Sequence, residues 1–236
     1  MKHAKRHPLI FGTIILTATG LITRVIGFFY RIYLSRLFGE EGMGIYQLLS
    51  PALSLSFSLT AAGYQTAISK YVAADSAKRP SGNLKPLLAG ISITLPLSLV
   101  TNAILFFSAD PIGIFLLKDH RTVPMLRILS FSVPFAALHA CINGYFYGKK
   151  KASVPALTQL LEQLARVSCV FLVTGADLAE GRTPSINAAV LGLTVGEIFS
   201  MLIALVCLYI HLYPDSSILS LQNICPSVPV YRDLLG

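Results

Sequence analysis

The stretch TRVIGFFYRIYLSRLFG, residues 23–39, places an arginine inside an apolar run and a second arginine seven residues later. The fifteen residues before Arg24, Leu9 to Thr23, carry no charge. They are too few to cross a hydrocarbon core, which takes about 20 residues of helix. A membrane helix that begins at Leu9 must therefore include Arg24. The alternative is a buried helix of a soluble protein that happens to carry charge.

Composition decides between these two settings. Of the 236 residues, 54% are hydrophobic and only 13% are charged. Soluble domains carry roughly 25% charged residues, so this chain lacks the polar side chains to cover a soluble surface. The alternation of polar and apolar residues that marks a membrane β-barrel is absent from the sequence. The composition predicts an integral membrane protein of the all-α class.

Six long apolar segments follow one another along the chain, each bounded by charged or turn-forming residues. Each is long enough to cross about 30 Å of hydrocarbon at 1.5 Å per residue. We expect a six-helix transmembrane bundle in residues 1–213, followed in 214–236 by a cytoplasmic tail or the start of a missing second half. The segments cover residues 10–33, 44–68, 86–107, 125–147, 154–175 and 187–212.

The lysines and arginines outside the helices predict the orientation. Eleven fall at the N-terminus, in the second and fourth connections and in the tail, whereas five fall on the opposite side. Because basic residues are enriched in cytoplasmic loops, both termini are expected in the cytoplasm. The net charge of +8 then reports topology and contact with anionic membrane lipid. No soluble basic module is present, so we expect no nucleic-acid partner.

The sequence gives no sign of an enzyme or of a bound metal. It lacks a Gly-x-Ser-x-Gly turn, a His-Glu-x-x-His pair and an Asp-rich metal motif. Its cysteines show neither disulfide nor zinc-ligand spacing. We therefore expect no catalytic residue, no metal and no cofactor. The cysteines are Cys141, Cys169, Cys207 and Cys225.

The two arginines of the opening stretch share one face of the first helix with small and polar residues. That face follows alternating steps of three and four, through Thr13, Thr17, Gly20, Arg24, Gly27 and Arg31. An arginine near the bilayer centre costs about 2.5–3.5 kcal/mol on insertion scales, and an anionic ligand or a buried carboxylate offsets that cost. Arg24 and Arg31 are the candidate substrate-binding residues. The alternative for Arg31 is that it extends to the outer membrane interface.

Polar side chains also line single faces of other segments. Glu162 and Arg166 have the spacing of an ion pair within one helix, with Gln163 beside them. They either line a cavity or form a self-neutralising structural pair. Gly192, Gly196 and Ser200 are predicted to form a seam for close helix packing. Such helices favour a bundle around a wet interior. Two further stripes are Gln47, Ser50, Ser54, Ser58, Ala61 and Gln65, beside Pro51, and Ser132, Ala136, His139 and Asn143, beside Pro134.

The motifs TRVIGFFYR, LSRLFGEEGMGIYQL and AISKYVA within residues 19–74 resemble the stage V sporulation protein B branch of polysaccharide exporters. This branch belongs with the lipid II flippases in one flippase superfamily. QLLEQLARV, residues 159–167, is similar to the family's fifth helix. The resemblance covers essentially the whole chain and implies one half of a two-lobed flippase fold in the bacterial cytoplasmic membrane.

The resemblance also implies a substrate, a partner and a residue role. Such proteins carry lipid-linked glycan or peptidoglycan precursors across the membrane, so the expected partner is a polyprenyl-pyrophosphate-linked glycan. Arg24 matches the arginine of the family's S/T-R-x-x-G-F motif, which implies contact with the pyrophosphate. The next cavity arginine of the lipid II flippases falls at Tyr30 by ungapped spacing, which weakens the same role for Arg31. A guanidinium suits this task because it holds phosphate oxygens bidentately.

The chain departs from the family in length, because family members run about twice as long and contain two similar halves. It is expected to be an N-terminal half, with either a missing second half or a homodimer that rebuilds the transporter. A drug or cation antiporter of the same superfamily is one alternative, with Glu162 and Glu197 as the only acidic residues well inside helices. A transport-inactive half or an accessory membrane subunit is the other.

Overall fold

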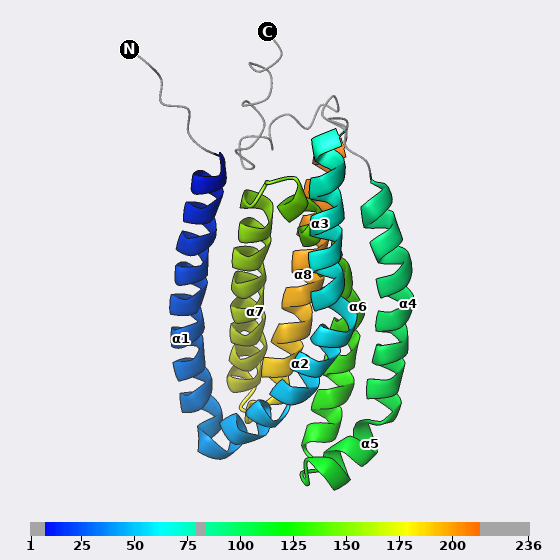
Figure 1. Ribbon diagram of the computed structural model, residues 1–236. Helices are drawn as coiled ribbons and strands as arrows, with labels where there is room; N and C mark the ends of the chain where they lie inside the picture. Colours follow the sequence, from blue (N-terminus) through cyan, green and yellow to red (C-terminus); the bar gives the residue numbers. More distant parts are fainter. Residues whose placement is uncertain (1–7, 79–83, 213–236) are drawn as a thin grey trace, which may run out of the picture.

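The computed structural model describes residues 8–78 and 84–212, which form helices and turns without any strand (Figure 1). The all-α prediction is confirmed. Five helical stretches of the described chain are long and apolar enough to cross a membrane. The first, Gly12–Asp75, covers 64 residues. At 1.5 Å per residue it would extend about 96 Å if straight, roughly three times the thickness of a hydrocarbon core.

This long stretch turns back on itself at Gly39. The helix α1, Pro8–Leu48, has a backbone φ of 68° and ψ of −176° at that residue. Such a positive φ costs glycine little, whereas the backbone of a residue with a side chain would be strained there. Figure 1 shows α1 running down one side of the bundle and the chain returning upward after the turn. The turn at Gly39 lies between the predicted segments 10–33 and 44–68, and the two arms would bring the crossings to the six that we predict.

The returning arm is interrupted near its start and again in its middle. Pro51 lies in the first turn of α2, Ser50–Phe57, where a proline is tolerated. A π-helical turn, Ser58–Ala62, then leads into α3, Gly63–Lys78. Within it the Thr60 hydroxyl donates a hydrogen bond to the carbonyl of Ser56 at 2.7 Å. The returning arm is thus interrupted beside Pro51 and again at residues 58–62.

The remaining segments form long helices joined by short connections. The long helices are α4, Lys85–Phe107, α6, Thr122–Gly148, α7, Ser153–Ala179, and α8, Asn187–Leu212. The connection between α4 and α6 contains the short helix α5, Ala109–Pro111, and a π-helical turn, Ile112–Leu116. Their bounds differ from the predicted segments by a few residues. The first predicted segment ends at residue 33, but α1 remains helical up to the Gly39 turn. Leu34 and Phe38 continue its buried face against α7 and α8, which explains the extension.

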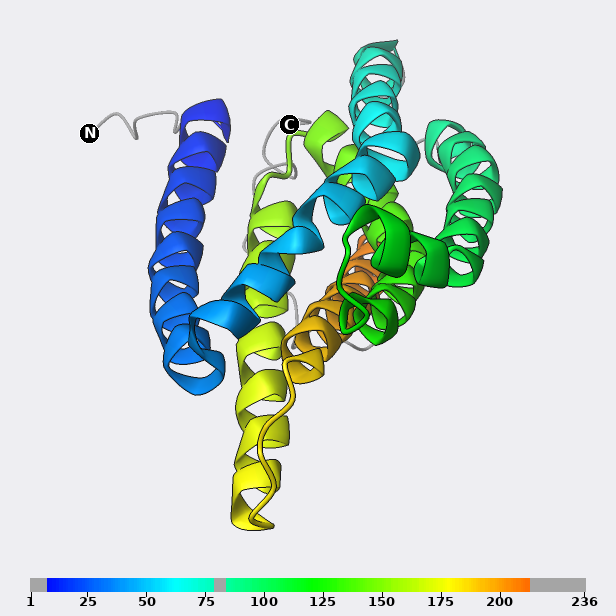
Figure 2. The same cartoon turned by 90° about the horizontal axis from the view of Figure 1, so that it is seen from below.

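The centre of the bundle is α6, which packs against α3, α4 and α8 (Figures 1 and 2). Its largest fully buried side chains include Met125, Leu126, Leu129, Tyr145 and Phe146. By contrast, α1 packs mainly against α7 and stands at one edge of the molecule. This position leaves much of the surface of α1 uncovered by the described residues.

Ion pairs tie together the connections at the end of the bundle where α1 turns. Arg121 donates to Glu41 at 2.6 Å, so the α5–α6 connection is linked to the turn after Gly39. Arg121 also donates to Asp119, at 3.2 Å, and these bonds lower the pKa of the Asp119 carboxyl. Arg127 donates to Asp110 at 2.6 Å. The distribution of basic residues predicts that this end faces the outside of the cell. Two of its arginines, Arg121 and Arg127, form ion pairs with carboxylates there.

Candidate functional site

Arg24 and Arg31 lie on the exposed surface of α1. Neither forms a hydrogen bond or an ion pair with a described residue. Arg24 is surrounded by exposed apolar side chains, since Leu21 is 64% and Phe28 is 63% exposed. The structure thus places an unpaired guanidinium in the middle of an apolar helix surface. Whether both arginines bind substrate stays a prediction.

The face of α1 that packs against the bundle lies beside the arginines. A Cβ on Gly27 would lie 3.6 Å from the amide nitrogen of Gln163, so this glycine faces α7. Further along, the Tyr33 ring stacks on Phe171, and its hydroxyl lies 2.7 Å from Thr174 Oγ1. The predicted stripe is therefore divided: its Gly27 edge contacts α7, while the arginines remain exposed.

Tyr30 belongs to this packed face, and the resemblance left it without a role. It is 8% exposed, and its hydroxyl has no hydrogen-bond partner among the described residues. It contacts a buried cluster that includes Leu34, Met43 and Val170. Tyr30 thus fills the α1–α7 interface with an apolar ring, and its hydroxyl provides a free donor there.

The polar stripe of the returning arm is also exposed over its first half. Ala61 is buried and Gln65 is half-buried, whereas the earlier members are open. The exposed members are Gln47, Ser50, Ser54 and Ser58. A polar face in a membrane helix is expected to contact protein or water rather than lipid. The exposed polar faces of α1 and α2 are therefore candidates for the lining of a cavity whose other wall is a further chain segment.

A second charged region lies inside the bundle, where α6, α7 and α8 meet. Glu162 and Arg166 on α7 form the ion pair that their spacing predicts. Arg166 also donates to Gln163 Oε1 at 3.4 Å. The Arg166 Nε is buried without a hydrogen-bond partner among the described residues. The two terminal nitrogens of Arg166 thus form hydrogen bonds, whereas its Nε does not. The role of Glu162, Gln163 and Arg166 in a cavity stays a prediction.

His139 on α6 is buried beside this ion pair and is surrounded by polar groups. The amide nitrogen of Asn143 lies 2.7 Å from its Nε2, and Ser200 Oγ lies 2.9 Å from the same atom. Its Nδ1 faces Glu197 Oε2 of α8 at 3.6 Å. One ligand atom from each of His139, Glu162 and Glu197 can be chosen so that all lie within 4.8 Å of one another. The sequence placed His139 only on a polar stripe and Glu197 only in the antiporter alternative, and it predicted neither as part of this cluster.

The sequence did contain a signal for this cluster. Ser132, His139 and Asn143 were predicted to share a face, and all three are buried. The Gly192–Gly196–Ser200 seam is also confirmed, because a Cβ at Gly192 would lie 3.0 Å from the carbonyl oxygen of Arg166. What the sequence did not show is that this seam brings Glu197 against α7, since three helices must be placed together to form the cluster.

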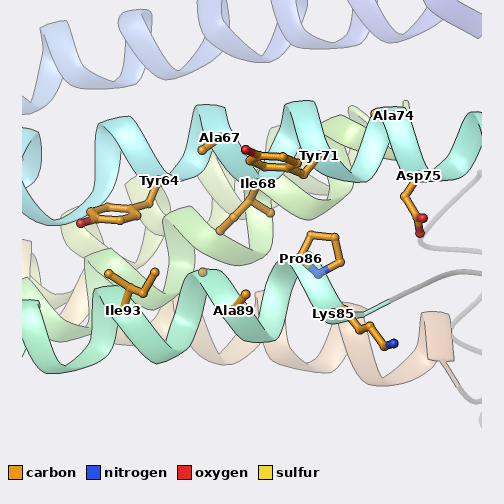
Figure 3. A pocket seen from close by; sticks show the side chains of 11 residues that line it. Tyr64, Ala67, Ile68, Tyr71, Ala74, Asp75, Lys85, Pro86, Ala89 and Ile93 are labelled. Atoms are coloured by element: carbon orange, nitrogen blue, oxygen red, sulfur yellow. The ribbon is translucent and has the colours of Figure 1, made fainter.

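An apolar groove of about 650 Å³ lies between α3 and α4, on the far side of the bundle from α1. Tyr64, Tyr71 and Ile93 line it, and Figure 3 shows Asp75 and Lys85 near one end. Neither Arg24 nor Arg31 contributes to it. Its lining suits a hydrocarbon chain, with charged groups at one end.

The fold and these sites define a polytopic membrane protein with an exposed cationic helix and a charged interior cluster. The chain belongs to the polysaccharide biosynthesis protein family, whose model matches residues 9–230.

Two relatives from Bacillus subtilis (strain 168) illustrate this membership. The chain is 36% identical to stage V sporulation protein B over 197 residues, which are 83% of this chain and 38% of that protein. It is 27% identical to the lipid II flippase MurJ over 179 residues, which are 72% of this chain and 32% of that protein. The chain thus spans a little over a third of the first relative and about a third of the second. No solved structure matches the chain significantly.

Proposed function

We propose that this chain forms one lobe of a transporter that carries a lipid-linked oligosaccharide or peptidoglycan precursor across the bacterial cytoplasmic membrane. The observation that carries the proposal is the position of Arg24. Its guanidinium is exposed and unpaired among the described residues, in the middle of the apolar helix α1. Family membership and the name of the relative MurJ support a lipid-linked substrate and transport rather than enzymatic chemistry.

The charge of Arg24 specifies the part of the substrate that it binds. A bare guanidinium in contact with lipid tails costs several kcal/mol, so α1 needs an anion or water against this face. A pyrophosphate meets that need, because its oxygens accept paired hydrogen bonds from the planar guanidinium. The low dielectric of the site strengthens this contact. Arg31, seven residues further along the same face, provides a second positive charge for the same anion.

A complete cavity requires a second wall opposite α1 and α2. The exposed polar stripe Gln47, Ser50, Ser54 and Ser58 supports such a wall, because these side chains are uncovered by the described residues. A second half of the family's two-lobed fold or a second copy of this chain would supply it. Two copies related by an axis along the membrane normal would produce a parallel repeat of the kind seen in transporters. We propose both termini on the cytoplasmic side, from the distribution of basic residues.

The test measures binding of undecaprenyl pyrophosphate to the purified chain, with undecaprenyl monophosphate and undecaprenol as comparison ligands. Arg24→Ala should weaken pyrophosphate binding about 10- to 100-fold, the equivalent of a charged hydrogen bond of about 1.5–3 kcal/mol. Arg24→Lys should restore part of the affinity, because lysine keeps the charge but loses the planar fork. Arg31→Ala should have a smaller effect.

Arg36→Ala is the matched control, since Arg36 is also exposed on α1 but lies near the Gly39 turn. It should bind pyrophosphate like the unmodified chain. Equal affinity for pyrophosphate and for undecaprenol, or an unchanged affinity of the Arg24→Ala protein, would show that Arg24 does not hold the phosphate.

A further inference from the structure

The interior cluster contains more negative than positive charge. Its acidic groups are Glu162 on α7 and Glu197 on α8, and its permanent positive charge is Arg166. The groups that act electrostatically on Glu162 are Glu197, Arg166 and His139. On the α1 side, Tyr30 and Tyr46 are the titratable groups near Arg166. Arg31 acts on Tyr46 rather than on the carboxyl groups. The charge state of His139 therefore decides the balance.

The hydrogen bonds around His139 indicate a neutral imidazole. The Asn143 amide nitrogen is a donor only, and it lies 2.7 Å from His139 Nε2, so this nitrogen accepts. The proton of a neutral ring then sits on Nδ1, which faces Glu197 at 3.6 Å. The Oδ1 of the same amide lies 3.4 Å from the Thr158 hydroxyl, whose single proton also has the carbonyl oxygen of Pro155 within 3.0 Å. With His139 neutral, two carboxylates share a single positive charge.

Glu197 is the less compensated of the two acids. Glu162 accepts a hydrogen bond from Arg166, whereas Glu197 has no hydrogen-bond partner among the described residues. Its side chain is only 23% exposed, and its neighbours include the like charge of Glu162. An ionised carboxylate that is largely removed from water and unpaired is costly, and two adjacent carboxylates relieve this cost by sharing a proton.

We propose that Glu162 and Glu197 form a proton-binding site that holds one proton between their two carboxyl groups in the folded bundle. The proton is shared between a carboxyl oxygen of Glu197 and the Glu162 oxygen to which Arg166 does not donate. The cluster is then electrically neutral, with one guanidinium, one carboxylate, one carboxylic acid and one neutral imidazole. A divalent metal suits the site less well, because Arg166 already places a positive charge beside Glu162 and Asn143 donates to the Nε2 lone pair of His139.

The geometry of α8 supports the site. Gly196, directly before Glu197, lets α8 approach so closely that a Cβ there would lie 3.2 Å from the carbonyl oxygen of Glu162. Ser200 and His139 continue the contact one turn further along α8. The carboxyl groups are therefore held together by helix packing, which keeps both in place whether or not the proton is bound.

The position of Arg166 gives the site a consequence for transport, and this step rests on the proposed function. Arg166 pairs with Glu162 and also acts electrostatically on Tyr30 of α1, the helix that carries Arg24. Loss of the proton increases the negative charge near Arg166 and strengthens its attraction to the acidic pair, which changes the electrostatic contact of Arg166 with α1. Proton binding itself is measured without any substrate, so a failure of this site and a failure of the proposed function are distinguishable.

The first test uses the unmodified chain in detergent and follows the unfolding equilibrium between about pH 7 and pH 8, above the ordinary pKa of histidine, so that the histidines of the unfolded chain are mostly neutral. Ordinary carboxyl groups of the unfolded chain are ionised in this range. If the folded state holds one additional proton, the folding equilibrium constant falls tenfold for each rise of one pH unit. A constant that is independent of pH in this range would overturn the proposal.

The second test is the infrared spectrum at neutral pH, in which a protonated carboxyl group has its own carbonyl band. The unmodified chain should show this band. Glu162→Gln and Glu197→Gln should each remove it, because the remaining acid then pairs with Arg166 as a carboxylate. Glu40→Gln is the matched control, since Glu40 is exposed near the Gly39 turn, and it should leave the band unchanged. A band that survives both cluster substitutions would assign the proton elsewhere.

The same measurements in sodium chloride and in choline chloride distinguish a proton from a sodium ion. The pH dependence and the infrared band should be equal in the two salts. A folded state that is stabilised by increasing sodium concentration, with the carboxyl band absent, would show that a monovalent metal ion occupies the site and would refute the proton assignment.

Discussion

A Cβ on Gly196 of α8 would lie 3.2 Å from the carbonyl oxygen of Glu162 on α7 and 3.3 Å from Arg166 Cβ. These are the two residues of the buried ion pair. The absence of a side chain at Gly196 therefore sets the distance between the two helices, and it places Glu197 beside Glu162. A sequence feature that serves packing thus also determines the composition of the charged cluster.

Gly196→Ala is expected to destabilise the bundle, although alanine is the better helix former. The added methyl group meets a backbone carbonyl that can move little, and overpacking of this kind costs about 1–3 kcal/mol. Thermal unfolding in detergent measures the change. Gly175→Ala on α7 is the matched control, because a Cβ there meets nothing within 4 Å. It should be neutral or stabilising by up to about 1 kcal/mol, and equal losses for both variants would refute the packing argument.

The Glu162–Arg166 pair should show strong coupling in a double-mutant cycle. Glu162→Gln leaves a buried guanidinium with less compensation, and Arg166→Gln leaves two acidic groups without their permanent positive partner. Because removal of both charges avoids these penalties, the double variant should lose less stability than the sum of the single variants. A coupling of about 0.5–3 kcal/mol is expected from unfolding measurements. Simple additivity would mean that the two side chains act independently.

The ion pairs at the end of the bundle near Gly39 should weaken in acid. Hydrogen bonds from Arg121 lower the pKa of Asp119 below its ordinary value of 3.8. A group with a lowered folded-state pKa contributes stability above its unfolded pKa, and this contribution is lost as the pH falls through the folded value. The unmodified chain should thus exceed Asp119→Asn in stability above about pH 4 and converge with it in stronger acid. A difference that persists unchanged in strong acid would exclude the carboxylate as its cause.

Much of the fold follows from the sequence because the bilayer imposes helices of fixed length. The apolar segments and the Gly192–Gly196 seam were both readable from local patterns. The extension of α1 to the Gly39 turn was missed, because Leu34 and Phe38 become helical through contacts with residues far away in the chain. The His139–Glu162–Glu197 cluster was missed for the same reason, since its members come from three helices.

The sequence also predicted that Arg24 and Arg31 would share a face with Gly27. In the structure only the Gly27 edge of that face packs against α7, and the two arginines remain exposed. A helical repeat identifies a face but not its neighbour. A Cβ on Gly27 would lie 3.6 Å from the amide nitrogen of Gln163, whereas the side chains of both arginines are exposed. Tyr30 shows the same limit, because its burial depends on α7 and α8 rather than on its own segment.

The orientation of the bundle is the last prediction. The connections α6–α7 and α7–α8 lie at opposite ends of the molecule in Figure 1, so the two should face opposite sides of the membrane. The α6–α7 connection contains Lys149, Lys150 and Lys151, and basic residues favour the cytoplasmic side.

In intact cells, a cysteine-directed reagent that cannot cross the membrane should label Glu180→Cys and leave Lys150→Cys unlabelled. The three native cysteines of the described residues, Cys141, Cys169 and Cys207, together with Cys225, are first replaced by serine or alanine. Permeabilised cells provide the control, because both cysteines should then react. Labelling of Lys150→Cys alone in intact cells would show that the orientation is the reverse of the predicted one. The anion would then reach Arg24 from the other side of the membrane.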